Sequence, residues 1–161
     1  MLSRIFPKQF DNAYRGHWLA IWLIVPTLLF KLTMGVNVAG LNPWISNRFI
    51  IQNADGIPID AFGAEASSVV MFLFASWGLC LLVLSLLGIV VLIRYRAMIP
   101  LMYLLLSIEQ FGRKGISLAS PIVKAVETGE VSLGFFINWG FMAALVIGLA
   151  LSLATPRRDG V

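Results

Sequence analysis

The chain has 161 residues, of which 59% are hydrophobic and only 12% are charged, and its mean hydropathy is +0.88. A soluble domain carries about twice that share of charged residues, near 25%, so the composition excludes an ordinary soluble protein and indicates a membrane protein. The length fits one domain. The formal net charge is +4, but the sequence shows no basic stretch with interleaved aromatic residues, so we expect no nucleic-acid partner.

The first 17 residues form a polar segment that we expect to lie at the membrane surface. Phe6, Phe10 and Tyr14 recur at four-residue spacing, interspersed with the charged residues Arg4, Lys8, Asp11 and Arg15, a pattern typical of a segment lying in a lipid interface. A first span follows near residues 18–39. We interpret it as retained rather than cleaved as a signal peptide, because its apolar stretch exceeds the usual length of about 7–15 residues and it contains Lys31.

Residues 40–66 form the longest loop, and their apolar content predicts a folded cap rather than disorder. Asp55 and Gly56 stand between two short apolar runs, which is a hairpin signal. A small hairpin or an interfacial cap over the outer end of the helices would fit. The second span, near residues 67–93, carries no charge. Cys80 lies within it and is the only cysteine, so no disulfide within the chain is possible.

The third span, near residues 98–120, has two interpretations. Its purely apolar part ends at Ile108 and gives only about 16 Å of helix, whereas a bilayer core is about 30 Å thick. The helix either continues through the polar residues that follow and crosses, ending at Pro121, or turns back at residues 112–115 as a half-span.

The distribution of basic residues favours a crossing. Lys and Arg accumulate in the cytoplasmic loops of membrane proteins. If the third span crosses, seven basic residues face one side (Arg4, Lys8, Arg15, Arg94, Arg96, Arg157 and Arg158) and two face the other (Arg48 and Lys124). We therefore predict an all-α polytopic membrane protein, a four-transmembrane-helix bundle with both termini in the cytoplasm.

The fourth span, near residues 131–154, has a small residue at every fourth position. These residues are Gly140, Ala144, Gly148 and Ser152. Small residues at this spacing allow a neighbouring helix to approach closely. The stripe packs either against a helix of the same chain, which we favour, or against a second copy.

Charged and polar residues inside the apolar spans are the most informative part of the sequence. A charge in hydrocarbon is costly and normally faces a bundle interior or a cavity, where it has a partner. Counted from the cytoplasmic end, Lys31 lies about 19 Å into its span and Glu109 about 18 Å into its own, so we expect them at the same depth. Arg113 follows Glu109 by about one helical turn and shares its face. The predicted cluster comprises Lys31, Glu109, Gln110, Arg113 and Lys114, with Asn37 and Asn138 as candidate extensions.

The cluster supports two hypotheses. Three basic residues accompany one carboxylate, so an anion, a lipid phosphate or a quinone carbonyl could balance the excess positive charge. Alternatively, the cluster is a salt-bridged network that fixes the register of the helices. The sequence contains no nucleophile–base–acid set, which favours a protein without catalytic residues. His17 is the only histidine, so we expect no metal site of the usual kind and no bis-histidine haem.

The segment RYRAMIPLM at residues 94–102, followed by EQFGR at residues 109–113, resembles small four-helix bacterial inner-membrane proteins of the DoxX-like kind. The resemblance covers the architecture of most of the chain, whereas the motif covers residues 94–113 only. Some proteins of that class are similar to membrane subunits of quinone-linked redox systems. The resemblance therefore implies a bacterial inner membrane and a quinone or lipid neighbourhood, and it carries over no catalytic residue.

We accordingly expect an integral membrane protein that binds a lipid or a quinone-like molecule near the charge cluster. We expect no covalent cofactor. The protein would act as an accessory subunit of a redox system. One alternative is a structural or assembly subunit of a larger membrane complex, with the cluster fixing helix register. A second is a minimal transporter that acts as an oligomer. The expected partners are membrane lipids and either other membrane subunits or further copies of the chain.

Overall fold

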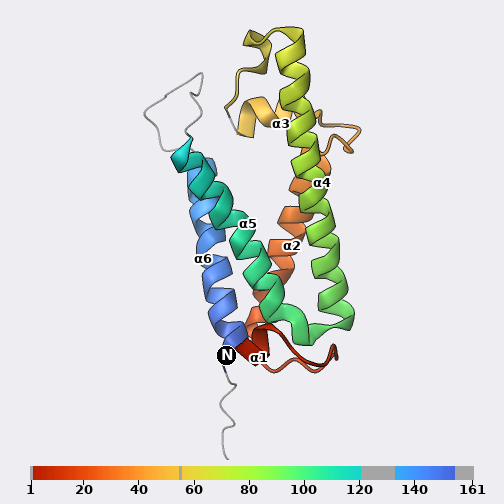
Figure 1. The fold of residues 1–161 in the computed structure, drawn as a ribbon, viewed down its shortest axis with the longest axis vertical. Coiled ribbons are helices and arrows are strands. Elements are labelled where there is room, and N and C mark those ends of the chain that lie inside the picture. Colours follow the sequence, from red (N-terminus) through yellow and green to blue (C-terminus); the bar gives the residue numbers. More distant parts are fainter. Residues whose placement is uncertain (1, 55, 121–132, 155–161) are drawn as a thin grey trace, which may run out of the picture.

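Helices make up all the regular structure in the described part of the chain. The computed structural model describes residues 2–54, 56–120 and 133–154. Figure 1 shows long helices running side by side, with short elements at both ends. In chain order the elements are α1 (Leu2–Ile5), α2 (Leu19–Val38), α3 (Asn47–Ala54), η1 (Ile59–Ala61), α4 (Ala64–Arg94), η2 (Arg96–Met98), α5 (Ile99–Ala119) and α6 (Leu133–Leu153).

Three of these helices, α2, α4 and α6, are long and apolar enough to cross a membrane, which indicates an integral membrane protein. The predicted limits of these spans lie within about three residues of the helices found. Helix α5 has 21 residues, the same length as α6, but it contains Glu109, Arg113 and Lys114. Helices α2 and α5 run in one direction and α4 and α6 in the other, so the described ends of the chain lie at the same end of the molecule (Figure 1).

Glycines determine how closely α2 and α4 approach. A Cβ at Gly78 would lie 2.3 Å from the backbone nitrogen of Ala39, and a Cβ at Gly35 would lie 2.8 Å from that of Leu82. Towards the other end of the pair, a Cβ at Gly88 would lie 2.3 Å from Leu28. At Gly78 and Gly35 the backbones therefore meet with no side chain between them, the arrangement that membrane helices use for close packing, whereas Gly88 makes room for the Leu28 side chain.

The main hydrophobic core occupies the end of the bundle where the first residues and α6's last residues meet, called here the inner end. Its buried members come from the first half of α2, the last turns of α4, the first half of α5 and the middle of α6: Ala20, Ile24, Leu28, Val91, Ile99, Met102, Tyr103, Leu106 and Leu145. The other half of the bundle, called the outer half, contributes no residue to this core and holds the charged side chains of Lys31, Glu109 and Arg113 instead.

The first residues close the inner end of the bundle. The helix in this segment is only Leu2–Ile5, and the chain that follows, where the aromatic spacing predicted an amphipathic pattern, is irregular as far as α2. Arg4 donates a hydrogen bond from Nη1 to the carbonyl of Leu153 at 2.6 Å, and the backbone N–H of His17 donates to that of Leu151 at 3.0 Å. The segment thus binds carbonyls at the end of α6, which lack partners within that helix.

The loop over the outer end is helical, so the hairpin predicted from Asp55 and Gly56 is wrong. Helix α3 begins after Ser46, whose Oγ accepts a hydrogen bond from the N–H of Phe49 at 3.2 Å, the geometry of a helix N-cap. Gly56 adopts a positive φ of 71° and provides the turn that follows. Asp55 lies outside the described residues.

A small core of its own holds this cap on α4. Its buried members, Ile51, Ile57 and Ile59, pack against Val70, Met71 and Phe74 of α4. The side chains of Gln52 and Arg48 also donate hydrogen bonds to the carboxylate of Asp60, joining α3 to η1. These two hydrogen bonds, Gln52 first, hold the pKa of Asp60 below its ordinary value.

Candidate functional site

Lys31 and Glu109 form an ion pair between α2 and α5. Nζ of Lys31 donates a hydrogen bond to Oε2 of Glu109, and another to Oε1 of Gln110 at 2.8 Å. The lysine is 4% exposed, and the side chain of Glu109 is 20% exposed. The equal depths expected from the sequence thus bring the two residues together. Nζ also lies 5.2 Å from the ring centroid of Phe141 on α6, a cation–π distance.

Gln110 is the centre of the polar network. It is 2% exposed, and its Oε1 accepts hydrogen bonds from Lys31 and, at 3.5 Å, from Nη2 of Arg113. Its Nε2 donates to Oδ1 of Asn138 on α6 at 2.5 Å. The network therefore connects α2, α5 and α6. The sequence placed Gln110 only beside the charged residues, whereas in the structure the amide is the one group that contacts three of the other members.

Arg113 lies at the edge of the network. Its Nε is 4.0 Å from Oε1 of Glu109, and its Cζ is 5.1 Å from the ring centroid of Trp77 on α4. The side chain is 42% exposed, although helix rise places Arg113 about 21 Å from the start of α5, within the thickness of a bilayer core. Inside hydrocarbon, a partly exposed guanidinium has no water to solvate it and needs an anionic or strongly polar neighbour.

Two predicted members do not join the network. Lys114 makes neither an ion pair nor a hydrogen bond with it in the described part of the chain. Asn37 instead accepts a hydrogen bond from Asn42 at 2.7 Å, at the end of α2. Trp77 and Phe141 were not anticipated from the sequence. Depth counting on the charge-free second span would have placed Trp77 about 25 Å from Arg94, close to the level of Arg113.

Buried leucines from two helices lie between the network and the inner end. Leu28 lies one turn below Lys31 on α2, and Leu106 lies one turn below Glu109 on α5; both are buried. Beneath them, the hydroxyl of Tyr103 donates a hydrogen bond to the carbonyl of Ala20 at 2.7 Å. Towards the outer end the packing is open, because α5 has no buried residue after Gln110. Any molecule reaching the network therefore approaches from the outer half.

The small-residue stripe on α6 is only partly a packing surface. Gly148 is buried, and a Cβ there would lie 2.2 Å from Cε1 of Tyr103. Ser152 is also buried, at the inner end. Gly140 is exposed, with no described atom within 4 Å of an added Cβ, and Ala144 is half-buried. The stripe therefore packs within the chain at its inner half, whereas no described residue of the chain packs against Gly140.

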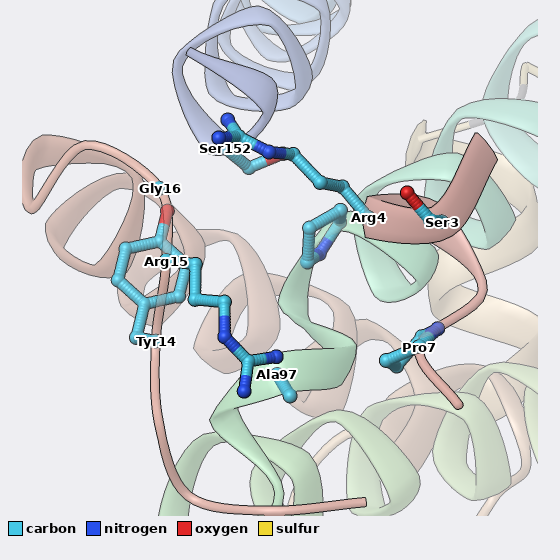
Figure 2. A pocket seen from close by; sticks show the side chains of 9 residues that line it. Ser3, Arg4, Pro7, Tyr14, Arg15, Gly16, Ala97 and Ser152 are labelled. Atoms are coloured by element: carbon cyan, nitrogen blue, oxygen red, sulfur yellow. The ribbon is translucent and has the colours of Figure 1, made fainter. Parts of the chain in front are cut away.

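Two cavities lie at the ends of the molecule, away from the network. The inner one, shown in Figure 2, has a volume of about 40 Å³ and lies between the first residues and the ends of α5 and α6. Tyr14 borders it; burial raises the pKa of this side chain to about 12, so the hydroxyl stays protonated and donates to the carbonyl of His17 at 3.1 Å. The outer depression, about 920 Å³, is lined by residues 40–49 except Leu41 and by Met71. Neither is lined by Lys31, Glu109 or Arg113.

The described residues contain no group of three or more His, Cys, Asp or Glu side chains placed to hold a metal ion. What the network provides is a buried ion pair, two amides and a guanidinium that faces outward between α4 and α5. This arrangement can bind an anionic or carbonyl-bearing group. Comparisons with protein-family models, with curated proteins and with solved structures find no significant match to this chain.

Proposed function

We propose that the chain crosses the membrane four times, with α5 as the remaining crossing and both termini in the cytoplasm of a bacterium. The 21 residues of α5 give about 31 Å of helix, enough for a bilayer core. The inner end carries the basic residues Arg4, Lys8, Arg15, Arg94 and Arg96, which supports a cytoplasmic position for that end. The ion pair supports the same model, because it gives Glu109 a partner inside the bundle.

The proposed function of this protein is to bind the polar head of an amphipathic molecule, a lipid or a quinone-like compound, at the network in the outer half. The observation that carries this proposal is Arg113, a guanidinium that is 42% exposed at hydrocarbon depth and only loosely contacted by Glu109 and Gln110. A bound head group would supply the polar contacts that lipid chains cannot. The resemblance to DoxX-like proteins supports a role as an accessory subunit near a quinone pool.

The alternative of a structural or assembly subunit also has support, because the network connects three helices and so fixes their register. That role accounts for Lys31, Glu109, Gln110 and Asn138, each of which has a partner in another helix. It does not account for the exposure of Arg113. The transporter alternative has less support, since the buried side chains of Leu28 and Leu106 lie between the network and the inner end.

The experiment compares the molecules that co-purify with three forms of the protein. The wild type, Arg113→Gln and the matched control Lys114→Gln are extracted in lipid–polymer discs, and bound lipids and quinones are quantified by mass spectrometry. The control removes the same charge one residue further along α5, outside the network. We expect an enriched species at fixed stoichiometry in the wild type and in Lys114→Gln.

The amount of that species bound per protein should be lower by about tenfold or more in Arg113→Gln, because a hydrogen bond to a charged group contributes about 1.5–3 kcal/mol. Equal composition in the three preparations, matching the bulk membrane, would rule out the binding function and leave the register role. Size-exclusion chromatography of the same samples tests the assembly alternative, which predicts a larger complex that survives mild solubilisation.

A further inference from the structure

We propose that the head group bound at this network is an oxyanion, the phosphate or carboxylate of an amphiphile from the outer leaflet, held by Arg113 against Trp77 and admitted sideways between α4 and α5. This inference rests on the proposed binding function and specifies its ligand class. A neutral quinone, which the binding function by itself allows, is then a poor ligand.

The charge of the network favours an anion. Lys31 and Glu109 neutralise each other, and Gln110 and Asn138 carry no charge, so Arg113 adds one uncompensated positive charge. A guanidinium stays charged in proteins and has five N–H donors in a planar fork. An oxyanion balances this charge and accepts two hydrogen bonds at once, whereas a neutral carbonyl leaves the charge uncompensated.

The contacts that Arg113 makes within the protein leave room for such a ligand. Its distances of 3.5 Å to Oε1 of Gln110 and 4.0 Å to Oε1 of Glu109 exceed the roughly 2.7–2.9 Å of a charge-assisted hydrogen bond. Oε1 of Glu109 is buried and has no hydrogen-bond partner in the described part of the chain, so this carboxylate does not hold the guanidinium tightly. The donors of Arg113 are therefore only weakly engaged by its neighbours on α5.

The indole ring of Trp77 on α4 contacts the guanidinium of Arg113. The 5.1 Å between Cζ of Arg113 and the indole ring centroid is a cation–π distance. A contact of this kind does not require all five N–H donors of the fork, so donors stay available for an oxyanion. The side chain of Ile116, which follows Arg113 by about one turn of α5, is exposed and apolar. A charged group beside an exposed apolar side chain suits a molecule that has an anionic head and a hydrocarbon tail.

The route to Arg113 is lateral. Helices α4 and α5 are joined at the inner end through η2 and diverge towards the outer end (Figure 1). Added Cβ atoms at Gly112 and Gly115 would meet no described atom within 4 Å, so no described residue packs on α5 at these two positions. The Arg113 backbone lies roughly 9 Å below the outer edge of a core about 30 Å thick, and its long side chain covers part of that distance by extending towards the surface.

The test uses Trp77 as a reporter of its own site. A form retaining Trp77 as the sole tryptophan carries Trp18→Phe, Trp22→Phe, Trp44→Phe and Trp139→Phe. It is reconstituted in phosphatidylcholine vesicles. Quenching of its fluorescence is measured against increasing mole fractions of three probes: a phosphatidic acid with brominated chains, a diacylglycerol with the same chains, and a benzoquinone with an isoprenoid tail. The acid and the diacylglycerol differ only in the phosphate.

We expect phosphatidic acid to quench Trp77 with saturation at a mole fraction about tenfold or more below that needed for the diacylglycerol or the quinone. Arg113→Gln should abolish this preference, Arg113→Lys should retain part of it, and Lys114→Gln should retain all of it. Because Arg113 is partly exposed, its variants should elute as the parent does in size-exclusion chromatography, so a lost preference is not misfolding.

The contrary outcomes separate the two proposals. Quinone quenching at least as strong as that by phosphatidic acid, and weakened by Arg113→Gln, would overturn the oxyanion ligand and leave the binding function intact. Quenching by all probes in proportion to their bulk concentration would overturn both. An undiminished preference in Arg113→Gln would remove Arg113 as the binding group. Displacement of brominated phosphatidic acid by millimolar inorganic phosphate would show a soluble oxyanion site instead of a lipid site.

Discussion

Gly148→Ala should destabilise the protein although it adds a single methyl group. The new Cβ would lie 2.2 Å from Cε1, 2.3 Å from Cζ and 2.5 Å from Oη of Tyr103, so the ring must move. Tyr103 is fully buried, and its hydroxyl donates to the carbonyl of Ala20 at 2.7 Å, so a displaced ring also loses this hydrogen bond. The helix most affected is α5, which would be pushed away from both α6 and α2.

The two contributions set the magnitude. Overpacking a core typically costs about 1–3 kcal/mol, and a hydrogen bond between membrane helices contributes about 0.6 kcal/mol on average. We therefore expect a loss of roughly 2–4 kcal/mol in the free energy of unfolding. The assay is reversible unfolding in mixed micelles with increasing mole fraction of a denaturing detergent, followed by circular dichroism.

Gly140→Ala is the matched control, because it makes the same change on the same helix where an added Cβ meets no described atom within 4 Å. It should leave stability unchanged or raise it by up to about 1 kcal/mol, as expected where Ala replaces a helical glycine without strain. The double variant Gly148→Ala with Tyr103→Leu should lose less free energy of unfolding than the two single variants lose in sum, because the smaller side chain at position 103 removes the clash. Equal stability of Gly148→Ala and Gly140→Ala would refute the reasoning.

Three further predictions concern the ion pair, the topology and the outer cap. Glu109→Ala should reduce the free energy of unfolding by about 3–5 kcal/mol, because it leaves Lys31 buried without its counter-charge. Changing both Lys31 and Glu109 to Leu should recover part of this loss in the same unfolding assay. If the double variant recovers nothing, the pairing is contradicted. The topology is tested in a Cys80→Ala background with a membrane-impermeant maleimide added to intact cells. The reagent should label Ala61→Cys directly, but Lys8→Cys and Arg158→Cys only after permeabilisation. Labelling of residue 158 from outside would contradict four crossings. Hydrogen bonds from Gln52 and Arg48 lower the pKa of Asp60 in the folded protein. The Asp60 carboxylate therefore stabilises the cap fully above its ordinary pKa of 3.8, and this stabilisation is lost as the pH falls through the lower pKa of the folded state. Amide exchange protection of α3 should accordingly drop in strongly acidic buffer, and Asp60→Asn, whose side chain does not titrate, should show no such drop.

The sequence by itself determined the class of the protein and the limits of its long helices. Both depend on the chain alone, because a bilayer requires about 20 apolar residues in every span. Counting helix rise also placed Lys31 and Glu109 at one depth, and the structure pairs them. The same counting indicated neither the central position of Gln110 nor the contact of Arg113 with Trp77. Depth fixes how far along a helix a residue lies, but not which way its side chain points.

Only the tertiary structure decided the orientation of the helices and the form of the outer loop. Asp55 and Gly56 indicated a hairpin. The structure has a helix instead, which Ser46 caps and whose apolar side packs against Val70, Met71 and Phe74 of α4. Four equally spaced small residues on α6 gave one prediction, yet Gly148 lies against Tyr103, whereas no described atom lies within 4 Å of a Cβ added at Gly140. In each case the sequence supplied a local preference, and the outcome depended on whether a residue distant in the chain occupied the adjoining space.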